Sequence, residues 1–573
     1  MKQTFIRRTV FLYPFLMVLC GVGYAKWDSY QLDGDALAFM DIADALHLHN
    51  WHLAVNGYWN PAYAAVLAIG QIIFHPTRWN ELQAYFYCNL AIFIAVIAAT
   101  YFFISGLLRL RARTNPNAQA DAALSPAALT LSTLAILFLS FQRELSLGKV
   151  RADALILFFF LIAAALLLRI QTGGKFIAYP TLGLALGGAY LTKSFGFLPS
   201  ALLLLAMLIY ALTRKAQARK TLLIGTAAAI AVFALVTAPY IRAISHEYGH
   251  LTTGESARMN YCFFVDQTPR WHEHFHQDTG HAIDHFEHPE TVLLSQPAVF
   301  SYAVHPTGTY PLWFDAAWYT DGLTPHLWLK GHIQRLARCT LLLLRFLLDH
   351  PEPILFLIVL LAAGATLRRT RAQLLPWLPV IAWGLLMFAI YFPIDFQERY
   401  LTAPFLFVVI PPLALLRKPR ADSPNFHNTT TIAALLLALL TLFAAVSDLA
   451  ARRRTLSVAG YPRGAYSKQI YPAATGLIAL GIQPGDKLAC MGDQACYIDE
   501  YWARLPQAQI LAEIEVHNSG SPAAFWQSLP NQSEVTRTLA AQNIKAIVAV
   551  FPSAPAPGWQ QLGDSNFYAL PLK

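Results

Sequence analysis

Residues 28–44 read DSYQLDGDALAFMDIAD and directly follow the first apolar segment of the chain. Five carboxylates crowd into this short stretch: Asp28, Asp33, Asp35, Asp41 and Asp44. Carboxylates at the edge of a bilayer are costly unless they are solvated or used, so each is a candidate for function. We expect the stretch to lie at the outer mouth of a membrane domain.

The rest of the chain has the composition of a protein solvated mostly by lipid. Of its 573 residues, 56% are apolar and 13% are charged, and the mean hydropathy is +0.42. An ordinary soluble domain carries about 25% charged residues. The length allows roughly ten membrane spans and one soluble domain. We therefore predict a polytopic α-helical membrane protein with a small C-terminal α/β domain.

The net charge of +9 would suggest a nucleic-acid partner in a soluble protein. Here Lys and Arg form short clusters between apolar runs, and no basic stripe with interleaved aromatics occurs, so nucleic acid is excluded as a partner. Lys2, Arg7 and Arg8 precede the first apolar run and predict a cytoplasmic N-terminus. A cleaved signal peptide is the competing interpretation, but no clear small-x-small cleavage site ends the run and many more spans follow. We expect a multi-pass protein of a cell membrane, most simply a bacterial inner membrane.

Apolar runs predict about eleven spans in a transmembrane domain over residues 1–450, with external loops at 26–81 and 241–338. After the N-terminal span, the runs lie at about 84–108, 124–142, 153–169, 177–192, 195–213, 221–240, 352–367, 374–392, 402–416 and 429–447. Every inner loop then carries at least two Lys or Arg residues. The apolar run at 61–75 is too short to cross a bilayer and predicts an interfacial or re-entrant helix.

Residues 452–454 are all Arg and disagree with this orientation, because they would lie outside after the last span. A miscount by one span would explain them. Residues 455–573 alternate short β-branched or apolar runs with helical stretches, which predicts an α/β accessory domain on the outer face. Cys490 and Cys496 lie close together in this domain. A disulfide and a pair of buried free thiols are both open for them.

Several short motifs occur in a fixed order along the chain. The positions are Asp35, Phe39 and Ala43, then Trp59, Pro61 and Tyr63, then Glu144, Arg151 and Asp153, then Thr192, Lys193 and Ser194, and last Arg399 and Tyr400. This order resembles that of the GT-C glycosyltransferases, which include protein O-mannosyltransferases and bacterial lipid A aminoarabinose transferases. The resemblance covers about residues 1–420. Ser194 departs from the family's Thr-Lys-Gly-like turn, where Gly would stand.

The resemblance implies a GT-C-like fold and transfer of a sugar from a polyprenyl-phosphate carrier on the outer face of the membrane. The acceptor would be a lipid, a glycan or a protein of the cell envelope. Such a carrier keeps its sugar phosphate at headgroup depth while its tail stays in lipid. No nucleotide site is needed for this chemistry, and no phosphate loop or GxGxxG motif occurs in the C-terminal domain.

The acceptor needs a base at headgroup depth, and we assign Asp35 to that role, with Asp33 as the alternative base. A solvated carboxylate or helix cap is the structural alternative for Asp35. Asp153 could assist the base or bind a divalent metal, and Glu144 is a weaker candidate of the same kind. A salt bridge of Asp153 with Arg151, or a helix N-terminal acid, is the structural alternative. Two further acids, Asp41 and Asp44, are predicted to be solvated on one helix face.

Phosphate binding needs cations on the same outer face, and Lys193 and Arg399 are the candidates, with Tyr400 beside the second. The structural alternatives are a snorkelling Lys193, and an Arg399 paired with Glu398 or Asp395. No cofactor is predicted with certainty, and a divalent metal stays open.

The external loop concentrates eleven of the eighteen histidines of the chain, six of them in 271–288. A zinc site there is conceivable, although the H-x-H-x-H spacing matches no defined zinc motif, and a solvated loop explains the composition as well. Residues 308–322 concentrate aromatics, which bind sugar rings or anchor a protein at the membrane interface.

Two other functions compete with the glycosyltransferase. A transporter or flippase of a lipid-linked glycan would place charges or helix breaks near the middle of paired spans. Its two halves would also show a sequence repeat, and no such repeat occurs in this chain. A membrane scaffold would leave Asp35, Lys193 and Arg399 dispensable.

Overall fold

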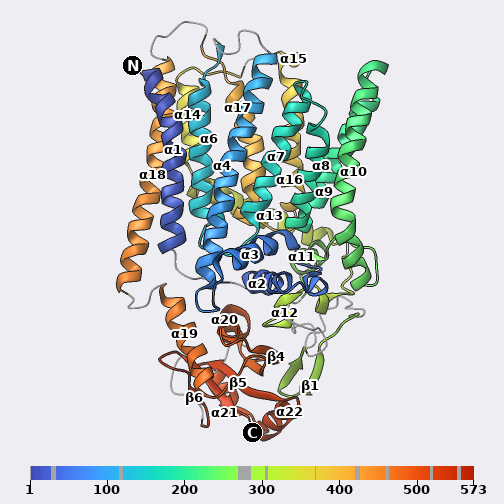
Figure 1. Cartoon of the computed structure of the whole chain (residues 1–573), viewed down its shortest axis with the longest axis vertical. Coiled ribbons are helices and arrows are strands. Elements are labelled where there is room, and N and C mark those ends of the chain that lie inside the picture. The colour runs from blue at the N-terminus through green and yellow to red at the C-terminus, as the bar shows by residue number, and fades with distance from the viewer. Residues whose placement is uncertain are drawn as a thin grey trace.

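The computed structural model describes residues 2–27, 32, 34–114, 121–268, 286–302, 308–367, 370–419, 426–458, 464–516, 521–551 and 557–572. A bundle of long helices fills the upper part of Figure 1, and a sheet with its own helices lies below it. The N-terminus lies at the end of the bundle that faces away from the sheet.

Within the described residues, nine helices are long and apolar enough to cross a membrane. They are Arg8–Trp27, Glu81–Thr114, Pro126–Arg143, Asp153–Gln171, Ser194–Leu212, Ala218–Glu247, Arg371–Tyr391, Glu398–Leu415 and Phe426–Arg454. Two other predicted spans form shorter helices, α8 (Ala178–Thr192) and α14 (Glu352–Ala362). At 1.5 Å per residue these two fall short of a hydrocarbon core of about 30 Å. The prediction of about eleven spans is therefore approximate, and the polytopic helical fold class is confirmed.

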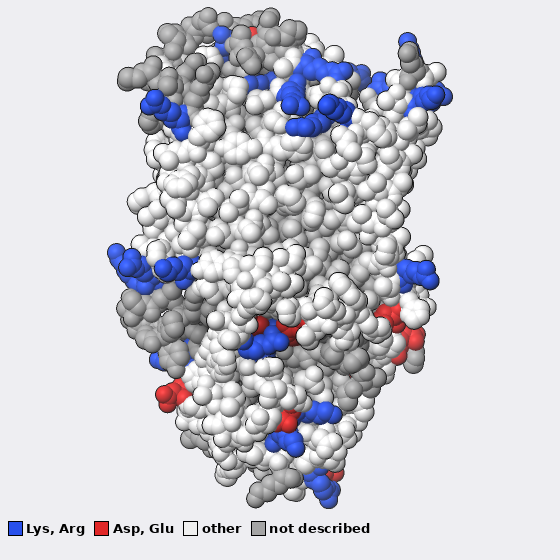
Figure 2. Space-filling view, in the orientation of Figure 1, with Lys and Arg blue, Asp and Glu red and all other residues white. Residues whose placement is uncertain are grey.

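Figure 2 shows a broad belt around the bundle that carries almost no charge. On this face nearly all charged residues above the belt, at the end where the N-terminus lies, are Lys and Arg, whereas below the belt Lys and Arg are mixed with Asp and Glu. Helix α18 (Phe426–Val458) runs unbroken to the opposite end. The three arginines at 452–454 therefore lie at the end of the bundle that faces the sheet, and no missing span is needed to place them.

Two helices of the first external loop lie across the lower end of the bundle, α2 (Gly34–His47) and α3 (Pro61–Phe74). Asn60 and Pro61 start α3, where the missing proline N–H costs nothing. The α3 helix has only 14 residues, as expected for a helix that does not cross. The amphipathic α13 (Leu329–Asp349) buries one face and exposes leucines on the other, which suits a helix at a lipid interface.

The sheet below the bundle has seven strands in the order β1-β2-β4-β3-β5-β7-β6. The strands are β1 (Thr291–Ser295), β2 (Ala298–Ser301), β3 (Lys487–Met491), β4 (Gln509–Ile514), β5 (Ile544–Val550), β6 (Gln560–Gln561) and β7 (Phe567–Pro571). Strands β4 and β5 run parallel to β3 on either side of it. Strand β2 belongs to the long external loop and pairs antiparallel with β4, Val299 opposite Ile514. The expected α/β domain therefore takes the last two strands on one side of its sheet, β1 and β2, from residues far upstream.

Alternation along β3 explains the two layers of helices around the sheet. Leu488 and Cys490 pack on one face, in the same core as α19 (Gly464–Ala479) and α20 (Tyr501–Arg504). Ala489 and Met491 pack on the other, under α21 (Pro522–Ser528) and α22 (Gln532–Ala541). The first face continues into the core of the bundle, so sheet and bundle share one apolar interior.

Arg504 links the sheet domain to the bundle through α2 and the first residue of α4 (Glu81–Thr114). Its guanidinium contacts Asp41, Asp44 (2.9 Å to Oδ2) and Glu81 (2.8 and 2.9 Å), although its side chain is only 3% exposed. Arg78 contacts the same Asp44 and Glu81, at 2.8 and 3.0 Å. The prediction that Asp41 and Asp44 are solvated is wrong, because the C-terminal domain covers them. Burial raises the pKa of Asp41, and the two arginines lower the pKa of Asp44 against the effect of its burial.

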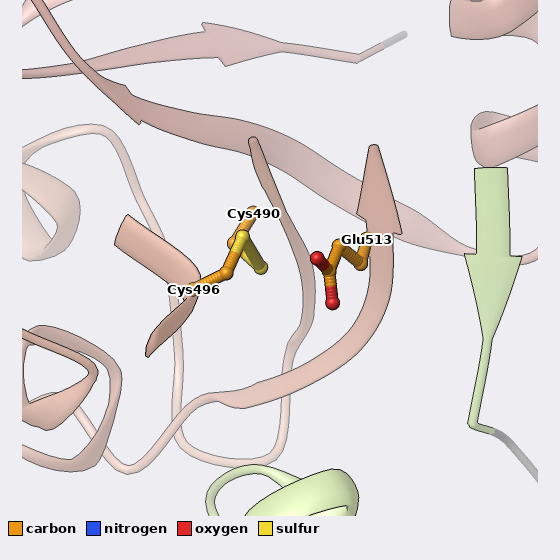
Figure 3. A group of neighbouring side chains, drawn as sticks. All are labelled: Cys490, Cys496 and Glu513. Carbon is orange, nitrogen blue, oxygen red and sulfur yellow. A yellow bond between two sulfur atoms is a disulfide. The ribbon is translucent and has the colours of Figure 1, made fainter. Parts of the chain in front are cut away.

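A disulfide joins Cys490 to Cys496, which decides between the two alternatives open for these cysteines. Figure 3 shows the pair beside the Glu513 carboxylate. That buried carboxylate accepts hydrogen bonds from Tyr310 (2.6 Å) and Tyr302 (3.2 Å), both from the external loop. Glu513 therefore ties the long loop to the sheet and is satisfied without a metal ion.

Candidate functional site

A cavity of about 660 Å³ lies where the bundle meets the external loops. Its walls come from seven segments: the start of α2, the loop before α3, the start of α7 (Asp153–Gln171), the turn after α8, helix α11 (Ser256–Phe264), the segment around α12 (Pro311–Phe314) and the stretch from α16 (Leu378–Tyr391) to η7 (Glu398–Leu401). Most of the charged residues expected at the site reach this one cavity.

Asp35 sits in the first turn of α2 and faces the cavity, with 26% of its side chain exposed. Phe39, one turn further on, is buried against Trp59 (ring centroids 5.2 Å apart) and Tyr63 (5.1 Å). Ala43, another turn on, is also buried. Residues four apart share a helix face, so the acidic–aromatic–small spacing anchors α2 by its second and third members and presents the first to the cavity.

Asp153 and Lys193 form the buried ion pair of the cavity. Asp153 begins α7, and Lys193 is the extended residue that ends α8. Lys193 Nζ donates to Asp153 Oδ1 at 2.6 Å. Only 5% of the Asp153 side chain is exposed, so its charge depends on this partner and on Arg399.

Arg399 joins the two carboxylates. Its NH2 lies 3.5 Å from Asp35 Oδ2 and its Nε lies 3.9 Å from Asp153 Oδ2. The alternative pairing with Asp395 is not formed, because Arg335 binds Asp395 instead. Asp35, Asp153, Lys193 and Arg399 thus form one cluster of two acids and two cations, drawn from segments as much as 364 positions apart in the sequence.

Aromatic side chains line the cavity beside this cluster, and only Tyr400 among them was predicted from the sequence. The Tyr400 ring stacks on Tyr391 (centroids 4.5 Å apart), and Tyr391 stacks on Phe195 (3.8 Å). Lys193 Nζ lies 4.7 Å from the centre of the Tyr400 ring, within cation–π distance. The sequence offered one indication that Tyr391 lies near Tyr400: its position at the outer end of a span, nine residues earlier.

Tyr58 faces the same cavity and was also missed. Burial raises its pKa, with a smaller contribution from the nearby Asp35 charge. Asn260 of α11 donates to the Tyr58 hydroxyl at 3.3 Å. Tyr58 adjoins the W-x-P-x-Y element, so its position in the loop was the clue.

Asp315 holds this loop from outside the cavity. Its buried carboxylate accepts hydrogen bonds from the Gly57 N–H (2.8 Å) and the Ala317 N–H (3.3 Å). Burial raises its pKa to about 7 in spite of these bonds. A side chain at Gly57 would lie within 2.5 Å of the Tyr248 ring, so glycine lets the loop pass. The aromatic segment 308–322 therefore supports the cavity through Asp315 and lines it through Trp313 and Ala316.

Two expected site residues are not tested by the structure. Asp33, the alternative base, lies outside the described residues. Glu144 belongs to η2 (Phe141–Leu145), but its side chain is not among those described. Arg151 does line the cavity.

The acids of the cavity are poorly arranged for a divalent metal. Asp35 and Asp153 both face Arg399, and Asp153 also binds Lys193. A metal ion shared by the two carboxylates would have to displace Arg399 or lie against its charge. The cluster suits an anionic ligand better, because an incoming phosphate would take over contacts of the cations.

Fold and site together define a class: a polytopic helical membrane protein with a charged and aromatic cavity where one end of the bundle meets the external loops, and with a sheet domain at the same end. No protein-family model matches the chain, and no curated protein matches it.

Two solved structures of ArnT from Cupriavidus metallidurans are similar to it. The apo form has 12% sequence identity and a TM-score of 0.48, and the form bound to undecaprenyl phosphate has 12% and 0.49. Each match covers 98% of this chain and 97% of the other.

Proposed function

We propose that this protein is an integral-membrane glycosyltransferase that moves a sugar from a polyprenyl-phosphate carrier to a lipid, glycan or protein acceptor on the extracytoplasmic face. Asp35 acts as the general base. The convergence of Asp35, Asp153, Lys193 and Arg399 on one cavity at the end of the bundle carries the proposal.

The chemistry needs one base and one anion site within reach of each other. The acceptor O–H or N–H attacks the anomeric carbon, the bond from that carbon to the phosphate oxygen breaks, and the proton passes to the base. The polyprenyl phosphate leaves with the bonding electrons. Asp35 supplies the base because it is the more exposed of the two acids, at 26% against 5% for Asp153.

Lys193 and Arg399 are the proposed phosphate site. Both lie beside the cavity with less than a fifth of their side chains exposed, where a phosphate contact is worth more than at an open surface. Asp153 holds these two cations in position while the carrier is absent. The cavity volume of about 660 Å³ is within the range of small-ligand sites, roughly 300–1,000 Å³.

The position of the charges supports surface chemistry over transport. A transporter of a charged substrate keeps its polar groups near the middle of the bilayer. Here the cluster lies where the bundle meets the external loops. The Cys490–Cys496 disulfide supports an oxidising compartment for the sheet domain, and the cationic end of the bundle supports a cytoplasmic N-terminus.

The test is transfer by the purified full-length protein from a labelled polyprenyl-phosphate sugar to a crude envelope acceptor fraction. We expect Asp35→Asn to lower the rate about 100- to 10,000-fold, the usual contribution of a general base. Asp448→Asn is the matched control, because Asp448 is also paired with an arginine, Arg452, but lies outside the cavity. Full activity in Asp35→Asn would remove the base assignment. Movement of the carrier across vesicles without any transfer would favour a flippase.

A further inference from the structure

A second cluster of ionisable groups lies outside the catalytic cavity, at the N-terminal end of α11. It joins His250, Glu255, His288 and Asp321, all from the long external loop. Ligand atoms of His250, Glu255 and Asp321 lie within 4.8 Å of one another. We propose that this cluster binds one zinc ion, independently of the proposed transferase activity.

The spacing of the ligand atoms fits a shared ion. Bonds of about 2.0–2.1 Å in a tetrahedral site place neighbouring ligand atoms about 3.3 Å apart. His250 Nε2 lies 3.1 Å from Glu255 Oε1, and His288 Nε2 lies 3.6 Å from Asp321 Oδ2. Within each pair, the two atoms therefore have about the separation of neighbouring ligands of one zinc ion. His250, Glu255 and Asp321 form the core of the proposed site, and His288 joins it through Asp321.

The hydrogen bonds around His250 point the same way. Its Nδ1 lies 2.9 Å from the Tyr248 carbonyl oxygen, which can only accept, so Nδ1 carries a proton. In the neutral ring Nε2 then has a lone pair, and this lone pair faces the Glu255 oxygen, which is also an acceptor. Either a second proton or a cation must lie between them. A backbone carbonyl on the far nitrogen is the usual partner of a metal-bound histidine.

Asp321 gives an independent observation. Its side chain is 1% exposed, and its Oδ2 accepts no hydrogen bond within the described residues. Its other oxygen, Oδ1, is held by Arg258 and by the Gly322 N–H at 3.0 Å. A buried carboxylate oxygen without a donor is costly, and a metal ion at Oδ2 would satisfy it.

Arg258 completes the second layer of the proposed site. It contacts Glu255 Oε2 at 2.8 Å and the far oxygen of Asp321, which leaves Glu255 Oε1 and Asp321 Oδ2 for the ion. It also neutralises one of the two carboxylate charges. Two imidazoles and two carboxylates suit zinc, whereas calcium and magnesium prefer oxygen ligands alone.

The position of the site gives the ion a structural role. Glu255 caps the N-terminus of α11, and the next residues of that helix, Ser256, Met259 and Asn260, line the catalytic cavity. His288 stacks on Trp318 at 3.7 Å, next to the segment that carries Asp321. Zinc would therefore join the start of α11 to two later parts of the same loop.

The test is the zinc content of the full-length protein, purified in detergent, loaded with zinc and desalted, measured by mass spectrometry of the metal. We expect about one tightly bound zinc per chain, and at most about a tenth of that in His250→Ala and in Asp321→Asn. His52→Ala is the matched control, because His52 also faces an acid, Glu247, but is largely exposed. His274→Ala controls for the histidines at 272–285.

Retained zinc in His250→Ala and Asp321→Asn would overturn the proposal, and so would loss of zinc in His274→Ala alone. If the variants do not fold, the wild-type protein provides the test. Adding zinc to protein that a chelator has stripped of metal should raise its melting temperature, and adding magnesium should not. Bound Co²⁺ should give the visible absorption of a four-coordinate site. A melting temperature indifferent to zinc would equally overturn the proposal.

Discussion

Replacing Arg504 by Met should loosen the sheet domain from the bundle and disturb a cavity that Arg504 does not touch. Arg504 is buried and contacts three carboxylates, and methionine fills a similar volume without the charge. Arg78 would keep its contacts with Asp44 and Glu81, but Asp41 would keep only its bonds from Thr309.

The expected cost is about 3–5 kcal/mol, because removing one member of a buried ion-pair network leaves charges uncompensated. For a domain of the size of the sheet domain, a loss of stability of this magnitude corresponds to a fall of roughly 10 °C in melting temperature. The effect should reach the proposed active site through α2, because Asp41 and Asp44 lie on the same short helix as Asp35. We therefore expect slower sugar transfer as well as lower stability.

Tryptophan fluorescence during heating measures the stability, since buried Trp502 lies in the same helix as Arg504. The double variant Arg504→Met/Glu81→Gln should recover part of the loss, because it removes one of the stranded charges. A melting temperature within about 1 °C of wild type in Arg504→Met would refute the reasoning. So would a double variant whose loss of stability relative to wild type equals the sum of the losses in Arg504→Met and Glu81→Gln.

Two further predictions concern single carboxylates. Asp153→Asn should cost about 3 kcal/mol of stability, because it leaves the charges of Lys193 and Arg399 without a partner in a largely buried site. Asp35→Asn should cost less than about 1 kcal/mol, because Asp35 is more exposed. Equal melting temperatures for the two variants would contradict the roles given to these carboxylates. Burial raises the pKa of Asp315 from 3.8 to about 7, so the folded state holds this proton more tightly than the unfolded chain. Its contribution to stability is complete below about pH 4 and is lost as the pH rises toward 7, by about 4 kcal/mol in total. Asp315→Asn should flatten the melting temperature over that range, and an unchanged pH profile would show that the carboxylate is ionised in the folded protein.

The sequence by itself determined the features that depend on local pattern. Apolar runs fix which segments enter lipid, and short runs such as residues 61–75 mark helices that cannot cross. The four-residue spacing of Asp35, Phe39 and Ala43 fixes which side chain α2 presents, because a helix repeats about every four residues. The sequence also predicted that Lys193 and Arg399 lie on the same face, and both line one cavity; their role as a phosphate site is our proposal.

Only the tertiary structure decided how distant charges are paired. Asp41 and Asp44 follow the pattern of a solvated helix face, yet Arg504, more than 400 residues later, buries them. The same holds for Arg399 between Asp35 and Asp153, for the stack of Phe195, Tyr391 and Tyr400, and for the β2 strand that joins the C-terminal sheet. Sequence spacing specifies neighbours within one helix or strand. The partner of a buried charge is set by which surfaces meet when the elements pack, and no local pattern encodes that.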